Sequence, residues 1–128
     1  MANDLSCKHV VADFALSPDK RRLFPGVEKN MVPGVLPVTD LKIRKGIVHL
    51  HARLLDRRDS VDGPEVDRTF KLFVAVVAEA QKRKGIDKRE TYHCGRINGK
   101  QVDDPHYTLR AWRAVVTYLL RHQEFLYE

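Results

Sequence analysis

The chain has 128 residues, of which 43% are hydrophobic and 31% charged, and its formal net charge is +6. This length fits one domain, the apolar fraction argues against wholesale disorder, and no apolar run reaches the roughly 20 residues of a membrane span. The first residues contain an early acid and no apolar stretch, which argues against a secretory signal. Two cysteines, Cys7 and Cys94, are too few for a disulfide framework, so we expect them to be reduced in a cytoplasmic setting.

The N-terminal part of the chain, residues 1–32, is expected to be irregular. Apolar residues alternate over residues 8–16, which predicts a short strand there. Pro-Gly pairs follow at 25–26 and 33–34. They favour type II turns, because proline fixes one dihedral and glycine accepts a positive φ.

The alternation is stronger over residues 46–55. His49, His51 and Arg53 fall on one side of an extended chain, and the apolar residues between them fall on the other. This predicts a half-buried strand with a polar outer face. A charged loop is expected over 56–65, and the spacing of apolar residues predicts a helix over 67–84.

The second half of the chain repeats this scheme. Residues 90–100 read as a strand that runs into a turn at Asn98-Gly99, and residues 107–125 read as a helix with Trp112 in the core. The helical segment 107–116 shares a threonine, an alanine and two valines with 68–77. The similarity suggests a duplicated unit, although Ala-Val-Val on an amphipathic helix also arises by chance.

These elements predict an α+β fold within a single domain, residues 1–128. Residues 33–86 would form a first strand–helix unit and residues 87–128 a second. Both amphipathic helices would pack on one face of a small antiparallel sheet. The other face of the sheet would carry Arg53 and Arg96 at matching positions.

Several short motifs resemble an AP2-like DNA-binding domain over about residues 33–125. The family includes plant AP2/ERF domains, and similar modules occur in phage integrase arms. The motifs are Pro33-Gly34-Val35, the basic stretch 42–46, Ala52-Arg53-Leu54 and the sequence from Gly95 to Lys100 around Asn98-Gly99.

The resemblance implies that the open sheet face lies in the major groove of DNA. Arg44, Arg53, Arg96 and Lys100 would then carry over as base or phosphate contacts. The sequence departs from the family pattern in three places, one of which is the lack of Pro-Gly-Val in the second unit. It has no aromatic residue in the strand before Ala-Arg, and it carries an acidic loop over residues 56–67 where a tight turn is usual.

The positive charge favours nucleic acid as the partner, with duplex DNA ahead of RNA. Lysines and arginines would displace counterions from phosphates, and outward sheet residues would contact groove edges. The residues predicted to bind nucleic acid are Arg44, Lys45, His49, His51, Arg53, Lys82, Arg83, Lys84, Lys88, Arg89, Arg96, Asn98 and Lys100. The aromatic residues do not alternate with basic ones as in a platform that stacks single-stranded bases.

A metal site is a weaker alternative. No Cys-x-x-Cys or His-Glu-x-x-His spacing is present, and surface histidines are common on a basic face. We therefore predict no metal and no cofactor. The residues considered as ligands are His49, His51, His93, Cys94 and His106.

Catalysis is also weakly supported. His49 or His51 would be the general base of a nuclease, with Arg53 stabilising charge on phosphate. The nearest acids, Asp56 and Glu65, fall in the charged loop and lack the spacing of paired catalytic carboxylates. We predict a protein that is not an enzyme.

The second function that the sequence allows is that of a small protein-binding modulator, for example a phage-encoded inhibitor of a host enzyme or defence complex. The acidic loop 56–67 counts in favour of this function. One contiguous basic face would favour nucleic acid, whereas acids around an exposed apolar patch would favour a protein partner. No membrane partner is expected, and the oligomeric state stays open.

Overall fold

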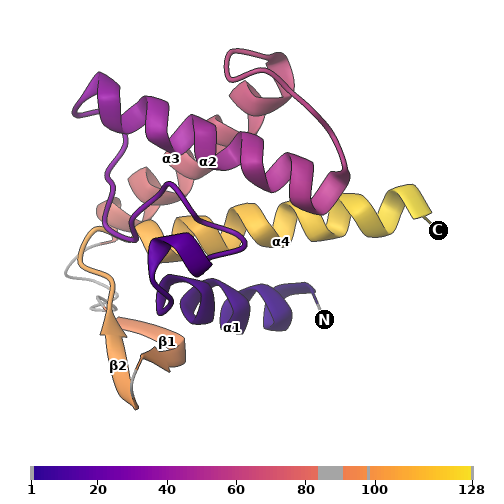
Figure 1. The fold of residues 1–128 in the computed structure, drawn as a ribbon. Coiled ribbons are helices and arrows are strands. Elements are labelled where there is room, and N and C mark those ends of the chain that lie inside the picture. Colours follow the sequence, from indigo (N-terminus) through magenta and orange to yellow (C-terminus); the bar gives the residue numbers. More distant parts are fainter. Residues whose placement is uncertain (1, 84–90, 98, 128) are drawn as a thin grey trace.

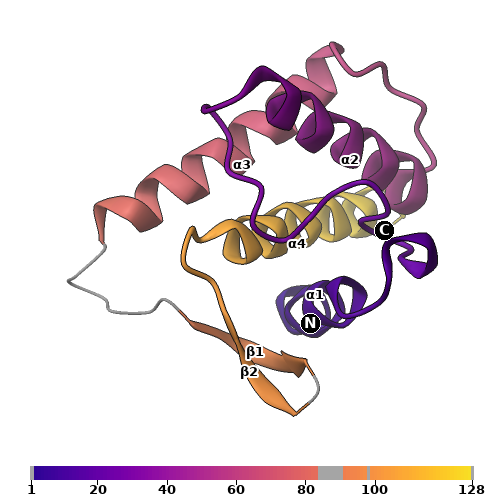
Figure 2. The same cartoon turned by 60° about the vertical axis from the view of Figure 1, so that its left-hand side comes forward.

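The computed structural model describes the backbone of residues 2–83, 91–97 and 99–127, and the side chains of residues 6–83 and 99–122. In both ribbon views α4 lies between α1 on one side and α2 and α3 on the other, with the hairpin near α1 (Figures 1 and 2). No helix in the described part is long and apolar enough to cross a bilayer. The elements are α1 (Ala2–Phe14), the 3-10 turn η1 (Pro18–Lys20), α2 (Pro37–Leu55), α3 (Pro64–Lys82), β1 (Thr91–Ile97), β2 (Lys100–Asp103) and α4 (Thr108–Tyr127).

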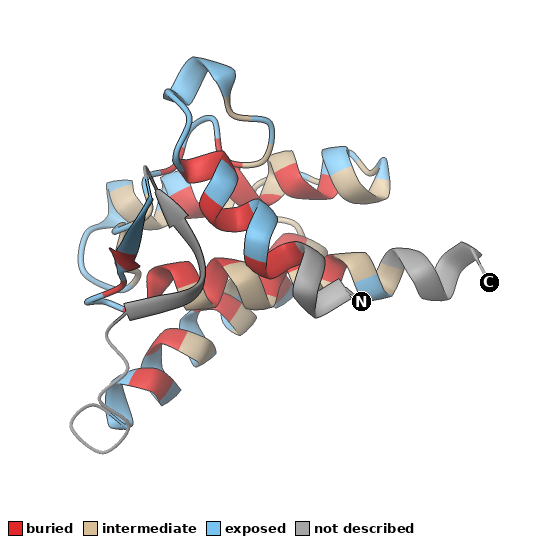
Figure 3. Cartoon of the chain, turned by 90° about the horizontal axis from the view of Figure 1, so that it is seen from below, coloured by how far each residue is buried: buried red, intermediate tan, exposed pale blue. Residues whose placement is uncertain are grey.

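The helix α4 is central because its apolar residues recur three or four positions apart. Leu109, Trp112 and Val115 are each 0% exposed, and buried positions of the helices face one another in the view from below (Figure 3). The Trp112 ring lies 5.1 Å from the Phe24 ring and 4.6 Å from the Phe73 ring, measured between centroids. The predicted helix over 107–125 and the burial of Trp112 are confirmed.

The start of α4 is fixed by a buried carboxylate. The backbone N–H groups of Leu109 and Arg110 donate to Asp104, at 3.0 and 3.1 Å. These bonds satisfy amides that have no partner inside the helix. Burial raises the pKa of the Asp104 carboxyl above its ordinary value, and the two backbone donors oppose that shift.

The predicted strand over residues 46–55 is wrong, because these residues lie inside α2. Proline at the first position suits the start of a helix. Ile43, Ile47 and Leu50 are each 0% exposed and recur at helical spacing. Gly46 sits where α2 approaches its neighbours closely, since a Cβ there would lie 2.5 Å from the Val27 side chain. His49, His51 and Arg53 therefore project from a helix and not from a sheet.

The predicted α+β fold is wrong, because the structure is mostly helical. Residues 8–14 belong to α1 and not to a strand. In the described part of the chain the strands form only the antiparallel pair β1 and β2, in which Thr91 pairs with Asp103. The predicted helix over 67–84 corresponds to α3, and Gly99 has the positive φ of 78° expected in the hairpin turn. Within the described part of residues 33–86, which ends at residue 83, there are two helices and no strand, so the predicted first strand–helix unit is wrong.

Candidate nucleic-acid interface

The outer side of α2 is basic. The sequence has no acidic residue between Leu41 and Leu55. Positions separated by three, seven and eleven residues share one face of a helix. The side chains of Lys42, Lys45 and Arg53 are exposed and that of His49 is half-buried. We call these four residues the α2 basic face.

The α2 basic face continues onto a neighbouring segment. His49 Nε2 lies 2.6 Å from the backbone carbonyl oxygen of Arg22. Arg53, Arg22 and His9 then line a groove of about 370 Å³, whose apolar lining includes Leu16. Basic side chains from α1, α2 and the connecting segment therefore lie around one hollow.

The one acid among the described residues that line this groove accepts hydrogen bonds from the backbone. The N–H groups of Arg22, Leu23 and Phe24 donate to the Asp13 carboxylate at 2.9, 3.1 and 2.9 Å. Asp13 is 7% exposed, whereas the side chains of Arg22 and Arg53 are exposed. The groove therefore keeps a basic rim.

Arg44, which the AP2-like resemblance assigns to DNA contact, lies against α3. Its Nη2 donates to Asp67 Oδ1 at 2.9 Å, and its guanidinium lies 4.4 Å from the centroid of the Phe70 ring. Arg44 and Lys71 together hold the pKa of Asp67 below its ordinary value. In this structure Arg44 joins two helices and lies outside the α2 basic face.

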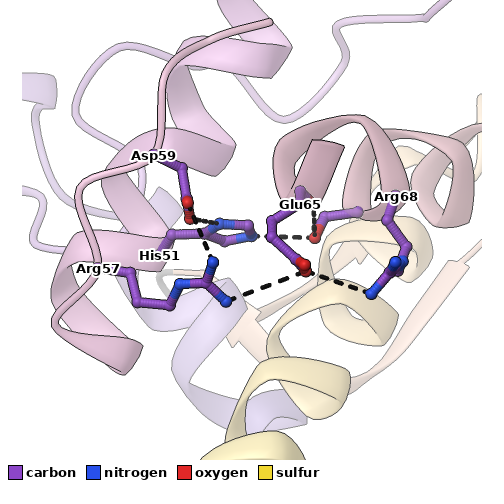
Figure 4. A network of polar contacts seen from close by, with 6 residues as sticks. His51, Arg57, Asp59, Glu65 and Arg68 are labelled. Carbon is purple, nitrogen blue, oxygen red and sulfur yellow. Dashed lines mark hydrogen bonds and ion pairs between the residues drawn. The ribbon is translucent and has the colours of Figure 1, made fainter. Parts of the chain in front are cut away.

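His51 is enclosed in a polar network (Figure 4). Its Nδ1 lies 2.8 Å from Asp59 Oδ2, and its Nε2 lies 2.9 Å from Thr69 Oγ1. The Thr69 hydroxyl also donates to the backbone carbonyl of Glu65 at 3.1 Å. At the rim, Arg57 Nη2 donates to Asp59 Oδ1 at 3.2 Å. The network links α2, the following loop and α3.

Asp59, His51 and Thr69 supply a carboxylate, an imidazole and a hydroxyl group, which are the three groups of a catalytic triad. His51 and Thr69 are each only 2% exposed. The cavity beside them holds about 10 Å³, which is room for roughly one water molecule. Because both side chains are buried in this structure, the geometry gives no support to His51 as a general base.

The remaining predicted site residues are spread over other elements. Lys82 and Arg83 are exposed at the end of α3, and Lys100 is exposed on β2. Arg96 lies on β1, with its side chain outside the described residues. Asn98, Lys84, Lys88 and Arg89 lie outside the described residues altogether. Of the predicted set, the structure brings Lys45, His49 and Arg53 onto one face.

A second basic surface was missed by the sequence analysis. It is a groove of about 520 Å³ between α3 and α4. Its three arginines are separated by three and eight positions along α4 and so share one helix face, a spacing that could have revealed them. We call it the α4 groove, lined by Leu72, Arg110, Arg113, Ala114, Thr117, Tyr118 and Arg121.

The structure also describes the side chain of one of the two cysteines and the distribution of side chains that could bind a metal. Cys7 is 5% exposed and is disulfide-bonded, so the expectation of reduced cysteines is wrong. Within the described residues, no three histidine, cysteine, aspartate or glutamate side chains gather as a metal site.

Comparison with known proteins found no family model, no curated protein and no solved structure that matches the chain. The AP2-like resemblance stays a prediction. One of its motifs, Ala52-Arg53-Leu54, lies in α2 and not in the strand that the family pattern requires.

Proposed function

We propose that this protein is a non-enzymatic nucleic-acid-binding protein that binds duplex DNA in preference to RNA. The observation that carries the proposal is the α2 basic face, in which four basic residues share one side of a helix with no acid among them. From residue 42 to residue 53 this face extends about 16 Å at 1.5 Å per residue. That length spans several phosphates along one strand.

The preference for DNA follows from the shape of the element. An exposed helix, roughly 10–12 Å across, fits the major groove of B-DNA, whereas the major groove of A-form RNA is too narrow to admit it. Lys42 and Lys45 would displace counterions from phosphates. Arg53, with Arg22 beside the same groove, has the planar donor geometry that also suits a guanine edge. A helix face thus replaces the sheet face that the sequence predicted.

The test measures binding of a labelled random DNA duplex at several salt concentrations. The double variant Lys45→Gln/Arg53→Gln should lose about tenfold in affinity, and its salt slope should fall by about 2. The matched control is Arg68→Gln/Lys71→Gln, which removes the same charge from α3. There the two cations pair with Glu65 and Asp67, at 3.3 and 3.0 Å.

The control should retain its affinity within about threefold, because its charges are already neutralised locally. An equal loss in both double variants would mean that net charge alone drives binding. Absence of binding by the wild type at low salt would overturn the proposal. A duplex RNA of the same sequence, if bound as tightly, would remove the preference for DNA.

A protein partner is a second candidate, favoured by one observation. Val35, Leu36, Val38 and Leu41 are 70%, 55%, 57% and 41% exposed, and they lie together at the start of α2. Exposed apolar clusters of this kind mark protein contacts. The variant Leu36→Ser/Val38→Ser should keep its affinity for duplex DNA and lose any protein captured by the wild type. If the variant captures the same protein as the wild type, this apolar surface is not the protein-binding site.

A further inference from the structure

The α4 groove combines an apolar floor with a basic rim. Leu72, Ala114 and the Tyr118 ring supply the apolar part, and Arg110, Arg113 and Arg121 supply the charge. Among the described residues that line it, none is acidic. Its volume of about 520 Å³ is typical of sites that hold a nucleotide-sized ligand.

The arginines are arranged along one side of α4. Positions 110, 113, 114, 117, 118 and 121 share a helix face that is distinct from the core positions Leu109, Trp112 and Leu119. Arg110 and Arg121 are separated by about 16 Å along the axis. The Arg110 guanidinium lies 5.1 Å from the centroid of the Tyr107 ring, which orients it at one end of the groove.

The Tyr118 ring of the groove lies beside the ring of His122, which is outside the groove lining. The rings of Tyr118 and His122 have centroids 6.3 Å apart and planes inclined by 26°. Both side chains are half-buried, so part of each remains accessible. Basic grooves with aromatic rings are typical of proteins that bind single strands, because every base presents a planar face for stacking.

We propose that the α4 groove binds single-stranded nucleic acid. A base would lie against Leu72, Ala114 and the Tyr118 ring, while the arginines contact the phosphates on either side. A duplex cannot use this groove in the same way, because its bases are stacked on one another and only their edges are accessible. The inference goes beyond the proposed duplex binding, since it concerns α4 and not α2.

An acidic polypeptide is the competing ligand. Its carboxylates would pair with the same arginines, but its binding would not depend on a planar ring against Tyr118. Dependence on the aromatic ring therefore separates the two ligands. Poly-L-glutamate serves as the competing probe.

The experiment measures the anisotropy of a labelled oligothymidylate of about 10 nucleotides, within the usual site sizes for single strands. Tyr118→Leu should weaken oligothymidylate binding at least about fivefold. Tyr118→Phe keeps the ring, so its affinity should stay within about twofold of the wild-type affinity. Arg121→Gln should weaken it about threefold or more and lower the salt slope by about 1. Lys20→Gln, on η1, removes one exposed charge elsewhere and should have no comparable effect.

Circular dichroism first establishes that each variant is folded. If Tyr118→Leu unfolds, Ala114→Glu provides the decisive variant, because it places a negative charge in the groove and should abolish oligothymidylate binding. Unchanged affinity in the groove variants would overturn the inference. Displacement by poly-L-glutamate at equal charge concentration would also overturn it, in favour of an acidic polypeptide.

The two proposals can fail separately. The variant Lys45→Gln/Arg53→Gln should lose duplex affinity and retain oligothymidylate affinity, whereas the groove variants should do the reverse. Loss of both affinities in every variant would mean that neither surface is a specific site.

Discussion

Both ring nitrogens of His51 are engaged inside the protein, with Asp59 on one side and Thr69 on the other. Removing one partner leaves a buried polar atom without a hydrogen bond, which costs more than the bond itself contributes. Thr69→Val keeps the side-chain volume and removes the hydroxyl. We expect it to lower the free energy of unfolding by about 1–3 kcal/mol, measured by urea denaturation.

A matched control is available on α2. Thr39 is half-buried near the start of that helix, and Thr39→Val should change the free energy of unfolding by less than about 0.5 kcal/mol. Equal effects of the two substitutions would show that the His51 network contributes nothing particular to stability.

The second prediction at the residue scale concerns Asp104 and the pH dependence of stability. Burial raises its folded pKa above the ordinary value of 3.8. A carboxyl with a raised folded pKa binds its proton more tightly in the folded state than in the unfolded state. Its contribution to stability is therefore complete below pH 3.8 and is lost as pH rises through the folded pKa.

The measurement compares wild type with Asp104→Asn, which cannot ionise. As pH rises from about 3 to about 6, the stability of the wild type should fall relative to that of the variant. A relative rise would mean that the backbone donors Leu109 and Arg110 outweigh burial, and that the pKa is lowered.

At the scale of elements, Gly46 decides how closely α2 approaches its neighbours. A Cβ at this position would lie 2.5 Å from Val27 Cγ2 and 3.4 Å from Trp112 Cη2. In an exposed helix, Gly→Ala stabilises by about 1 kcal/mol. Here Gly46→Ala should instead destabilise by about 1–3 kcal/mol, because the core is overpacked. Thermal unfolding of the wild type and of Gly46→Ala measures this difference in stability.

Two further variants identify the cause. Adding Val27→Ala to Gly46→Ala should cost less than the sum of the two single substitutions, because it removes the contacting methyl group. Gly26→Ala has no atom within 4 Å and should be nearly neutral. An additive double variant would exclude the Val27 contact as the cause.

The same glycine explains why α2 could not be predicted. Residues 46–55 alternate between apolar and polar, as in a strand, and Gly46 resembles the start of one. The helical pattern becomes visible only when Ile43 is included, since 43, 47, 50 and 54 follow the 3.6-residue period. The contact with Val27 that keeps a glycine inside the helix is tertiary, and no local pattern encodes it.

The helices α3 and α4 were predictable, because their apolar residues have helical spacing over more than four turns. The hairpin turn was predictable from Gly99. The site was predictable only in part. The charge of Lys45 and Arg53 is plain in the sequence, but their common face depends on α2 being a helix. Arg110 and Arg121 escaped notice because Tyr118 and Leu72 complete their groove only after folding.

At the scale of the whole molecule, a chain of aromatic rings crosses the core. Phe14 stacks on Phe24 with centroids 4.3 Å apart, and Trp112 lies between Phe24 and Phe73. These rings come from α1, α3, α4 and the segment between α1 and α2. Loosening one ring therefore affects the packing of several elements at once.

The last prediction tests whether the elements unfold as one unit. Phe24 is 0% exposed, and Phe24→Leu should lower the free energy of unfolding by about 1–2 kcal/mol. Trp112 is the only tryptophan, so its fluorescence reports on the centre of the core. Far-UV circular dichroism reports on all the helices. Because the ring chain couples them, both signals should shift by the same amount and stay coincident. A fluorescence transition that precedes loss of helix would show that the single-domain prediction is wrong.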